Sequence, residues 1–304
     1  MPTKNKILLI IAGPTAVGKT DLCINLAKKF NSCIVSADSR QFFNEMNIGT
    51  AKPSLEELGQ VKHYFINNLS ITADYDVGKY EKEALPLLEE LFKSRNLVIL
   101  TGGSGLYIDA VTHGFDDIPA VDESIRAGLN LIFEREGIAV LQEKLQLLDP
   151  VYYEKVDINN PQRLIRALEV SMGTGKSFSS FRKRKKTSRP FKVLKIGLER
   201  ERKELYDRID QRVERMVAAG LFEEAKALYP MRHYNALQTV GYKEIFGYLE
   251  GKYDKEEAIN LLKRNSRRYA KRQMTWFRRD EGFHWFHPSQ MQEIVELIND
   301  QIEE

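Results

Sequence analysis

The stretch ILLIIAGPTAVGKT, residues 7–20, decides the fold of this chain. Its first five residues are branched and apolar, which is typical of a buried strand. Residues 13–20 fit the pattern G-x-x-x-x-G-K-[ST], and a helix-like segment, residues 21–30, follows them. In such a loop the glycines let successive backbone N–H groups point into one concavity, which the positive end of the helix dipole completes. The stretch therefore predicts a site for a di- or triphosphate.

Lys19 and Thr20 supply the side-chain chemistry of this loop. A lysine at this position reaches the outer phosphate oxygens, and the hydroxyl of the next residue can hold Mg²⁺. Thr20 is therefore the candidate metal ligand. The candidate phosphate-binding residues are Gly13, Pro14, Thr15, Ala16, Val17, Gly18, Lys19 and Thr20.

The composition is that of an ordinary globular protein. The chain has 304 residues, of which 42% are hydrophobic and 29% charged, enough for one large domain or two unequal ones. No apolar run approaches the roughly twenty residues that a membrane span needs, and the start MPTKNK is unlike a signal peptide. We expect a cytoplasmic protein without a membrane partner.

Cysteine and histidine are sparse in this sequence. Cys23 and Cys33 fall in the first helix and second strand, where buried apolar roles are expected rather than a disulfide or metal pair. His284 and His287 are spaced as H-x-x-H, but no cysteine or third histidine lies near them in the sequence. The sequence predicts no zinc site.

Two more strands end in polar residues. The apolar segment 32–37 runs into Asp38, and the strand 97–101 runs into Gly102-Gly103-Ser104-Gly105. Because the carboxyl ends of parallel strands face the ligand, we expect Asp38 and the Ser104 hydroxyl to lie beside the phosphate loop. A carboxylate there can hold Mg²⁺ through water, act as a base, or cap the next turn.

Strands and helices alternate through the first third of the chain, which indicates a doubly wound, mostly parallel sheet. A short strand is expected at 63–66, and a helix over 76–93 with a kink or boundary at Pro86. The pattern predicts an α/β phosphate-loop core with an inserted all-helical domain. The core takes residues 1–118 and 191–304, and the insertion takes residues 119–190.

Inside the insertion, two helices are expected over 122–148, broken near Gly137, and another over 161–172. Gln162, Arg163 and Arg166 share a face of the last helix, and Leu164, Ile165 and Leu168 supply its buried side. The segment GTGKS, 173–177, imitates a second phosphate loop but follows a helix and lacks the first glycine. It is interpreted as a helix C-cap.

Charge is unevenly distributed, although the net charge is only +3. Residues 182–192 and 263–279 are strongly basic, which suggests a polyanionic partner larger than a nucleotide. The basic segment 181–192 fits a solvated linker or a nucleic-acid contact equally well. The segment 263–279 contains no acid and favours contacts with a phosphate backbone. Its two adjacent stripes are Lys263, Arg267, Lys271 and Arg264, Arg268, Arg272.

Seven motifs carry a resemblance over nearly the whole chain. They are GPTAVGKT (13–20), SADSRQ (36–41), MNIGTAKP (46–53), TGGSGLY (101–107), NPQRLIRALEV (160–170), TVGYKE (239–244) and KRQMTWFR (271–278). In this order they resemble the bacterial tRNA dimethylallyltransferase family. The resemblance implies transfer of the prenyl group of dimethylallyl diphosphate to the exocyclic N6 amine of the adenosine 3′ of the anticodon. It also implies Mg²⁺ as cofactor and the anticodon stem-loop of tRNA as partner. We further expect a monomer.

The resemblance also implies roles for individual residues. Asp38 becomes the base on the adenine amine, beside Ser104, which stands where the family usually has threonine. Lys19, Thr20 with Mg²⁺ and the loop amides would neutralise the diphosphate, helped by Arg208 or Arg212, between which the sequence does not choose. The implied tRNA contacts are Asp38, Ser39, Arg40, Gln41, Ser104, Arg126, Gln162, Arg163, Leu164, Ile165, Arg166, Gln238, Lys243, Lys271, Arg272, Gln273 and Arg278. No cysteine or histidine follows His287, so the zinc extension of eukaryotic members is not expected.

Three other functions compete with this interpretation. A small-molecule phosphate-loop kinase would share the loop and Asp38 but would not need the basic stretches. An adenylate isopentenyltransferase would use the same donor with free nucleotide as acceptor. A non-catalytic, ATP-dependent RNA-binding module would leave Asp38 and Ser104 without a role.

Overall fold

The computed structural model describes residues 5–182 and 187–303. The chain forms two compact units, residues 1–112 with 188–304 and residues 113–187, called here the core and the helical domain. Their bounds differ by a few residues from the expected 119–190. The Thr187 N–H donates to the His113 carbonyl oxygen (2.9 Å), so the two connecting segments meet there. Of the basic segment 181–192, residues 183–186 lie outside the described residues.

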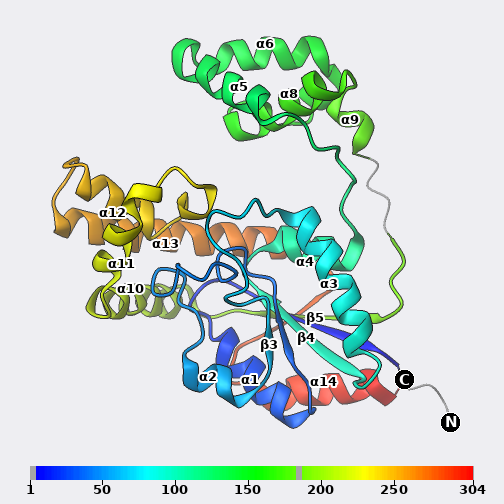
Figure 1. The fold of residues 1–304 in the computed structure, drawn as a ribbon. Helices are drawn as coiled ribbons and strands as arrows, with labels where there is room; N and C mark the ends of the chain where they lie inside the picture. The colour runs from blue at the N-terminus through cyan, green and yellow to red at the C-terminus, as the bar shows by residue number, and fades with distance from the viewer. Residues whose placement is uncertain (1–4, 183–186, 304) are drawn as a thin grey trace. The chain divides into compact units, whose positions relative to one another are not determined.

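The core is built on a parallel sheet with the strand order β3-β2-β4-β1-β5-β6 (Figure 1). The strands are β1 Ile7–Ala12, β2 Ile34–Ser36, β3 His63–Tyr64, β4 Leu97–Gly102, β5 Lys192–Leu198 and β6 Phe283–Phe286. β1 lies between β4 and β5, and every residue of β1 is buried. The parallel sheet confirms the predicted α/β class. Strand β6 was missed, because four aromatic-rich residues at a sheet edge carry little alternation.

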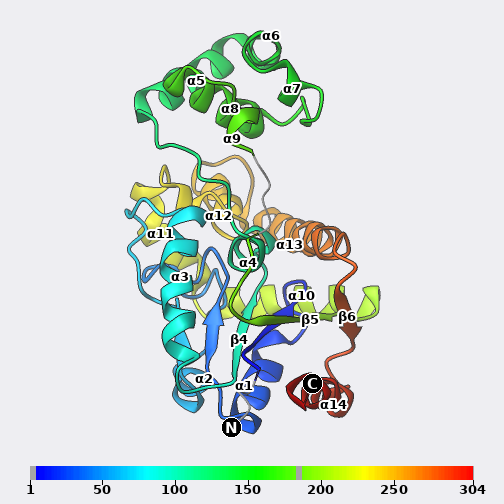
Figure 2. The same cartoon turned by 90° about the vertical axis from the view of Figure 1, so that its right-hand side faces the viewer.

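Helices cover both faces of the sheet (Figure 2). The core helices are α1 Lys19–Lys29, α2 Leu55–Gln60, α3 Val77–Leu91, α4 Gly105–His113, α10 Arg202–Ala218, α11 Leu221–Leu228, α12 Tyr242–Leu249, α13 Lys255–Phe277 and α14 Met291–Glu303. Two short 3₁₀ turns are Tyr229–Met231 and Asn235–Leu237. Leu9 of β1 packs with α1, α10 and α14, and its neighbour Leu8 packs with α3 and α4. This alternation follows from the two-residue repeat of a strand.

Helices α10 to α13 add a third apolar cluster away from the sheet. Val213, Phe222, Ile245 and Leu262 meet there with Met46. The cluster packs α10 and α13 against each other, so their side chains can reach the carboxyl ends of the strands. Helix α3 runs on through Pro86, so the boundary considered there does not occur.

The helical domain has its own apolar core. Its helices are α5 Glu123–Glu136, α6 Ile138–Leu148, α7 Pro150–Tyr153, α8 Pro161–Thr174 and α9 Phe178–Phe181. Gly137 (φ +81°) separates α5 from α6, as predicted. Gly175 (φ +67°) ends α8 in the left-handed conformation, which confirms the C-cap interpretation of the GTGKS segment.

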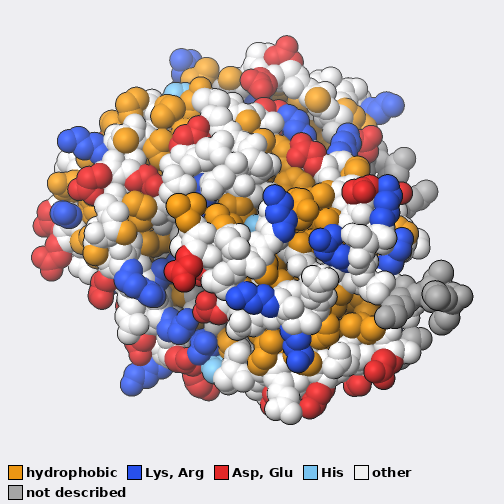
Figure 3. Space-filling view, turned by 60° about the horizontal axis from the view of Figure 1, so that its bottom comes forward, with side chains coloured by type: hydrophobic (Ala, Val, Ile, Leu, Met, Phe, Trp, Pro, Cys, Tyr) orange, Lys and Arg blue, Asp and Glu red, His pale blue; other side chains and the backbone are white. Residues whose placement is uncertain are grey.

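The surface gives two further facts about the molecule. On the face drawn in Figure 3, lysine and arginine side chains are interspersed with aspartate and glutamate, so this face carries charges of both signs.

Over residues 5–182 and 187–303, no helix combines the length and apolar character that a membrane span requires.

Candidate active site

The loop between β1 and α1 has the backbone conformation of a phosphate-binding turn. A Cβ on Gly13 would lie 2.7 Å from the carbonyl oxygen of Leu198, so no side chain fits there. Gly18 adopts φ +113°, a left-handed value that favours glycine, and no side chain caps the α1 N-terminus that follows it. The Lys19 ammonium donates to the carbonyl oxygens of Gly13 (2.9 Å) and Pro14 (2.8 Å). Backbone carbonyl groups of the loop thus hold the side chain of Lys19.

Three side chains from distant elements hold the loop in place. Arg200 Nε donates to the Val17 carbonyl oxygen (2.7 Å), and Arg208 Nε donates to the Ala16 carbonyl oxygen (2.9 Å). Gln273 of α13 accepts from the Thr15 N–H and donates to the Gly103 carbonyl oxygen, both at 2.9 Å. Gln273 is buried, so its side chain joins two loops of the core and is not exposed for the expected tRNA contact.

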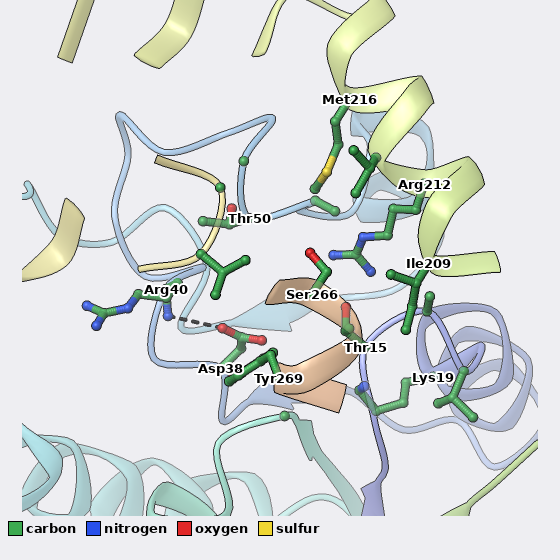
Figure 4. A pocket seen from close by; sticks show the side chains of 18 of the residues that line it. Thr15, Lys19, Asp38, Arg40, Thr50, Ile209, Arg212, Met216, Ser266 and Tyr269 are labelled. Atoms are coloured by element: carbon green, nitrogen blue, oxygen red, sulfur yellow. Dashed lines mark hydrogen bonds between the residues drawn. The ribbon is translucent and has the colours of Figure 1, made fainter. Parts of the chain in front are cut away.

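A cavity of about 390 Å³ opens in front of the loop (Figure 4). Its lining comes from residues 15–21, the turn after β2, residues 49–51, residues 239–241, and side chains of α10 and α13. Figure 4 shows Lys19 and Arg212 on one side of this cavity and Asp38 and Arg40 on the other. The cavity lies at the carboxyl ends of the strands, as expected for a parallel sheet.

Two partly buried cations, Lys19 and Arg212, line the cavity, and the pKa values of both are lowered. Burial lowers the pKa of Lys19 to about 8, although the nearby Asp38 carboxylate opposes this shift. Burial also lowers the pKa of the Arg212 guanidinium, again against the influence of Asp38. Within the described residues, Arg212 makes no hydrogen bond or ion pair, whereas Arg208 is engaged with Ala16. The lining carries five basic side chains (Lys19, Arg40, Arg208, Arg212 and Arg215) and three carboxylates (Asp21, Asp38 and Glu57), so the cavity attracts an anion.

Asp38 and Ser104 follow neighbouring strands of the sheet, and Ser39 joins them, since it is next to Asp38 in the chain and bonded to Ser104. The Arg40 N–H donates to Asp38 Oδ1 (3.0 Å), which fixes the carboxylate in a tight turn. The Ser104 hydroxyl accepts from the Ser39 N–H (3.0 Å) and donates to the Ser39 hydroxyl (3.1 Å). The structure therefore ties the glycine-rich segment after β4 to the turn that carries Asp38.

Tyr269 is a cavity residue that the sequence analysis missed. It lies next to Asp38 in Figure 4, and burial raises the pKa of its phenol to about 12. Leu262, Ser266 and Gln273 line the cavity with it. Their spacing of three and four residues puts all four on one face of α13. The sequence does carry this signal, because these four residues recur at helical spacing between the basic residues of α13.

One wall of the cavity is apolar, and this too was missed. Ile209, Val213 and Met216 of α10 line it together with Val240 and Leu262. The α10 residues recur at helical spacing, next to Arg208 and Arg212 on the same helix. The cavity thus offers cations at the loop and an apolar wall beside them.

The basic stripes of α13 divide into two kinds. Lys263 pairs with Glu214 (2.6 Å) and Arg267 with Asp210 (2.5 Å), both acids of α10, so this stripe mainly joins two helices. The sequence does not reveal this pairing, because the two acids come from a distant segment. The exposed cations Arg264, Arg268, Lys271 and Arg272 form no ion pair among the described residues.

The other expected tRNA residues of the core are partly engaged. Arg40 donates to the Asn235 carbonyl oxygen (3.1 Å), and Gln41 donates to the carbonyl oxygens of Thr50 (3.3 Å) and Ala51 (3.2 Å). Exposed residues of this group are Gln238, Lys243 and Arg278, of which Arg278 pairs with Glu199 at 2.5 Å.

In the helical domain, the expected residues form a charged cluster over an apolar core. Arg126 and Arg166 both pair with Glu169, a buried carboxylate of α8, and Arg126 also donates to Gln162 (3.3 Å). Arg163 is exposed. The prediction that Leu164 and Ile165 contact tRNA is wrong for their side chains. Both are fully buried, because they occupy the inward face of an amphipathic helix.

Fold and site together define a phosphate-loop protein. A parallel sheet carries the loop, and the cavity in front of it can hold a diphosphate next to an apolar group. The carboxylate of Asp38 faces the same space.

Comparison with known proteins agrees with this class. The family described as IPP transferase matches residues 41–280. The chain is 49% identical to a tRNA dimethylallyltransferase of Cytophaga hutchinsonii over 99% of both chains, and 53% identical to that of Christiangramia forsetii over 92% of both. The tRNA isopentenylpyrophosphate transferase of Bacillus halodurans superposes with a TM-score of 0.72 at 40% identity, covering 99% of this chain and 97% of its own. A eukaryotic dimethylallyltransferase acting on tRNA gives 0.78 at 27% identity, with 98% and 80% coverage. The chain belongs to the IPP transferase family.

Proposed function

We propose that this protein transfers the dimethylallyl group of dimethylallyl diphosphate to the N6 amine of the adenosine 3′ of the anticodon in tRNA. The observation that carries the proposal is one cavity in which a phosphate loop, an apolar wall and a carboxylate converge. Family membership and the names of the full-length relatives support the same activity.

The cavity has residues suited to both parts of a prenyl diphosphate, the charged diphosphate and the apolar five-carbon chain. The loop amides, Lys19 and Arg212 would bind the diphosphate, and the uncapped N-terminus of α1 adds its positive partial charge. Ile209, Val213 and Met216 would cover the five-carbon chain, whose burial is favourable at roughly 25 cal/mol per Å². Of the two arginines, Arg212 is proposed for the diphosphate because Arg208 already holds the loop.

The residues present also fit a magnesium ion held jointly with the donor. Thr20 and Asp21 line the cavity, and no group of three or more His, Cys, Asp or Glu side chains is arranged for a metal within residues 5–182 and 187–303. Mg²⁺ is commonly held by one or two protein oxygens together with substrate phosphates. When bound, it would supply neutralisation of the charge on the departing diphosphate.

Asp38 is proposed to take the proton from the attacking amine. A bond forms between N6 and the allylic carbon, the carbon–oxygen bond to the diphosphate breaks, and the N6 proton passes to the carboxylate. The Arg40 N–H bond to Asp38 Oδ1 (3.0 Å) leaves Oδ2 available for that proton. The adenine must leave the stack of the anticodon loop to reach this cavity.

We propose that polar and basic side chains of each unit contact the tRNA. In the core we propose Arg264, Arg268, Lys271 and Arg272, and in the helical domain Arg126, Gln162, Arg163 and Arg166. All groups of the proposed reaction come from one chain, so we propose a monomeric enzyme. Because its proposed substrate is tRNA, we also propose a cytoplasmic location.

The test combines purified protein, Mg²⁺, dimethylallyl diphosphate and unmodified tRNA, followed by digestion and mass analysis of the nucleosides. We expect an adenosine carrying one five-carbon prenyl group. Product with free AMP but not with tRNA would instead identify an adenylate isopentenyltransferase. Turnover of ATP without prenyl transfer would identify a kinase or an ATP-dependent RNA-binding module.

Changing Lys271 and Arg272 to alanine should weaken tRNA binding and reduce its salt dependence, leaving the affinity for dimethylallyl diphosphate unchanged. Each lost phosphate contact should reduce the slope of log K against log salt by about 1. The measurement is tRNA affinity over a series of salt concentrations.

Arg267→Ala is the matched control, because Arg267 lies on the same helix and pairs with Asp210. It should lower thermal stability with little change in salt slope. An unchanged slope in the Lys271 and Arg272 variant would exclude these two residues from the RNA interface.

A further inference from the structure

Glu224 of α11 binds the backbone of a loop that lines the cavity. Its carboxylate oxygens accept hydrogen bonds from three consecutive N–H groups, those of Asn47, Ile48 and Gly49, each at 2.9 Å. The Tyr242 hydroxyl donates to the same carboxylate at 2.7 Å. Successive N–H groups that converge in this way form an anion-binding concavity, and here a side chain of the protein itself fills it.

The loop has little freedom to pack in another way. A Cβ on Gly49 would lie 2.6 Å from the ring of Tyr242, so the backbone of the loop rests directly on that ring. Tyr242 is buried and Glu224 is partly buried. Glu224 and Tyr242 together therefore fix the loop from the side away from the cavity.

This loop is bonded to the turn that carries Asp38. Thr50 and Ala51 line the cavity, and their carbonyl oxygens accept from the Gln41 side chain (3.3 and 3.2 Å). Figure 4 shows Thr50 on the side of the cavity where Asp38 lies, across from Lys19. A displacement of residues 47–51 would therefore pass through Gln41 to the Asp38 turn.

We propose that Glu224 is a positioning residue for the acceptor side of the site. It holds residues 47–51 against α11, and these residues hold the turn whose carboxylate takes the amine proton. The proposal rests on the proposed prenyl transfer, since its consequence is a slower transfer step. Glu224 acts through the loop, because the loop lies between its carboxylate and the cavity.

Glu224→Gln breaks this arrangement with little change of shape. Glutamine keeps one acceptor oxygen and places a donor where the other oxygen was, so at least one N–H of residues 47–49 then faces another N–H. Glu224→Asp keeps both oxygens on a side chain one methylene shorter and should rescue part of the effect. Glu223→Gln is the matched control, because Glu223 is the exposed neighbour on the same helix.

The experiment combines hydrogen exchange with transfer kinetics on the full chain, using dimethylallyl diphosphate and an unmodified anticodon stem-loop. For Glu224→Gln we expect faster exchange of the amides in 47–51 and in the 38–41 turn. We also expect kcat to fall about 10- to 100-fold, as small misplacements of reacting groups do. The KM for dimethylallyl diphosphate should stay within about twofold, since Lys19 and the loop amides are untouched. Glu224→Asp should fall between wild type and Glu224→Gln, and Glu223→Gln should match wild type.

Unchanged exchange of 47–51, or faster exchange with kcat unaltered, would overturn the proposal. A rise confined to the KM for dimethylallyl diphosphate would also overturn it, because it would place the effect on the donor side. If the wild-type protein gave no prenylated tRNA, the proposed function itself would fail. Exchange of the 38–41 turn in Glu224→Gln would then decide the positioning role alone, faster exchange supporting it and unchanged exchange refuting it.

Discussion

Asp38→Asn is expected to lower the single-turnover rate of prenyl transfer by about 10²–10⁴, the range found for removal of a general base. Asparagine preserves the side-chain shape and can still accept from the Arg40 N–H, so the turn should keep its structure. It cannot take the amine proton. Binding of dimethylallyl diphosphate should be retained, because the loop and its cations are unchanged.

The measurement is the rate of prenylated adenosine formation with enzyme in excess over tRNA, alongside the affinity for each substrate. Ser104→Thr is a suitable control, since it keeps a hydroxyl next to Ser39 and should remain close to wild type. A rate for Asp38→Asn within threefold of wild type would remove Asp38 from the role of base.

Lys19→Met should reduce kcat/KM for dimethylallyl diphosphate by about 10²–10³, the loss typical of removing one donor that stabilises developing negative charge. Lys19 is the cation within the phosphate-binding loop, and among the described residues its hydrogen-bond partners are the carbonyl oxygens of Gly13 and Pro14. Lys29→Met, at an exposed position on the same helix, is the matched control and should have little effect.

The lowered pKa of Lys19 gives this prediction a pH dependence. With a pKa of about 8, the free protein loses the Lys19 proton above that pH, so diphosphate binding must then take up a proton. From this group alone, the Kd for dimethylallyl diphosphate should rise about tenfold between pH 7 and pH 9 and be nearly constant below pH 7. Calorimetric titrations across this range would show it. In Lys19→Met the pH-dependent component should vanish, and a persistent rise would assign it to another group.

The sequence by itself determined the parts of this protein that depend on local pattern. The run from Ile7 to Thr20 has the period and glycines of a strand, loop and helix start, and these act over a few residues. Asp38 and Ser104 could be placed together because the carboxyl ends of parallel strands share one edge of a sheet. The helices of the insertion could be predicted from their periodicity, and the end of α8 at Gly175 from the position of the glycine.

Tertiary structure alone decided which polar side chains are available for a ligand. Lys263 and Arg267 look like nucleic-acid contacts in the sequence, yet they pair with Glu214 and Asp210 from another helix. Gln273 matched a tRNA motif and instead joins two loops, and Arg208 holds the phosphate loop while Arg212 remains in the cavity. Hydrogen-bond partners so far apart in the chain leave no local signal. Periodicity therefore gave the elements and their order, whereas long-range packing decided the use of each charged group.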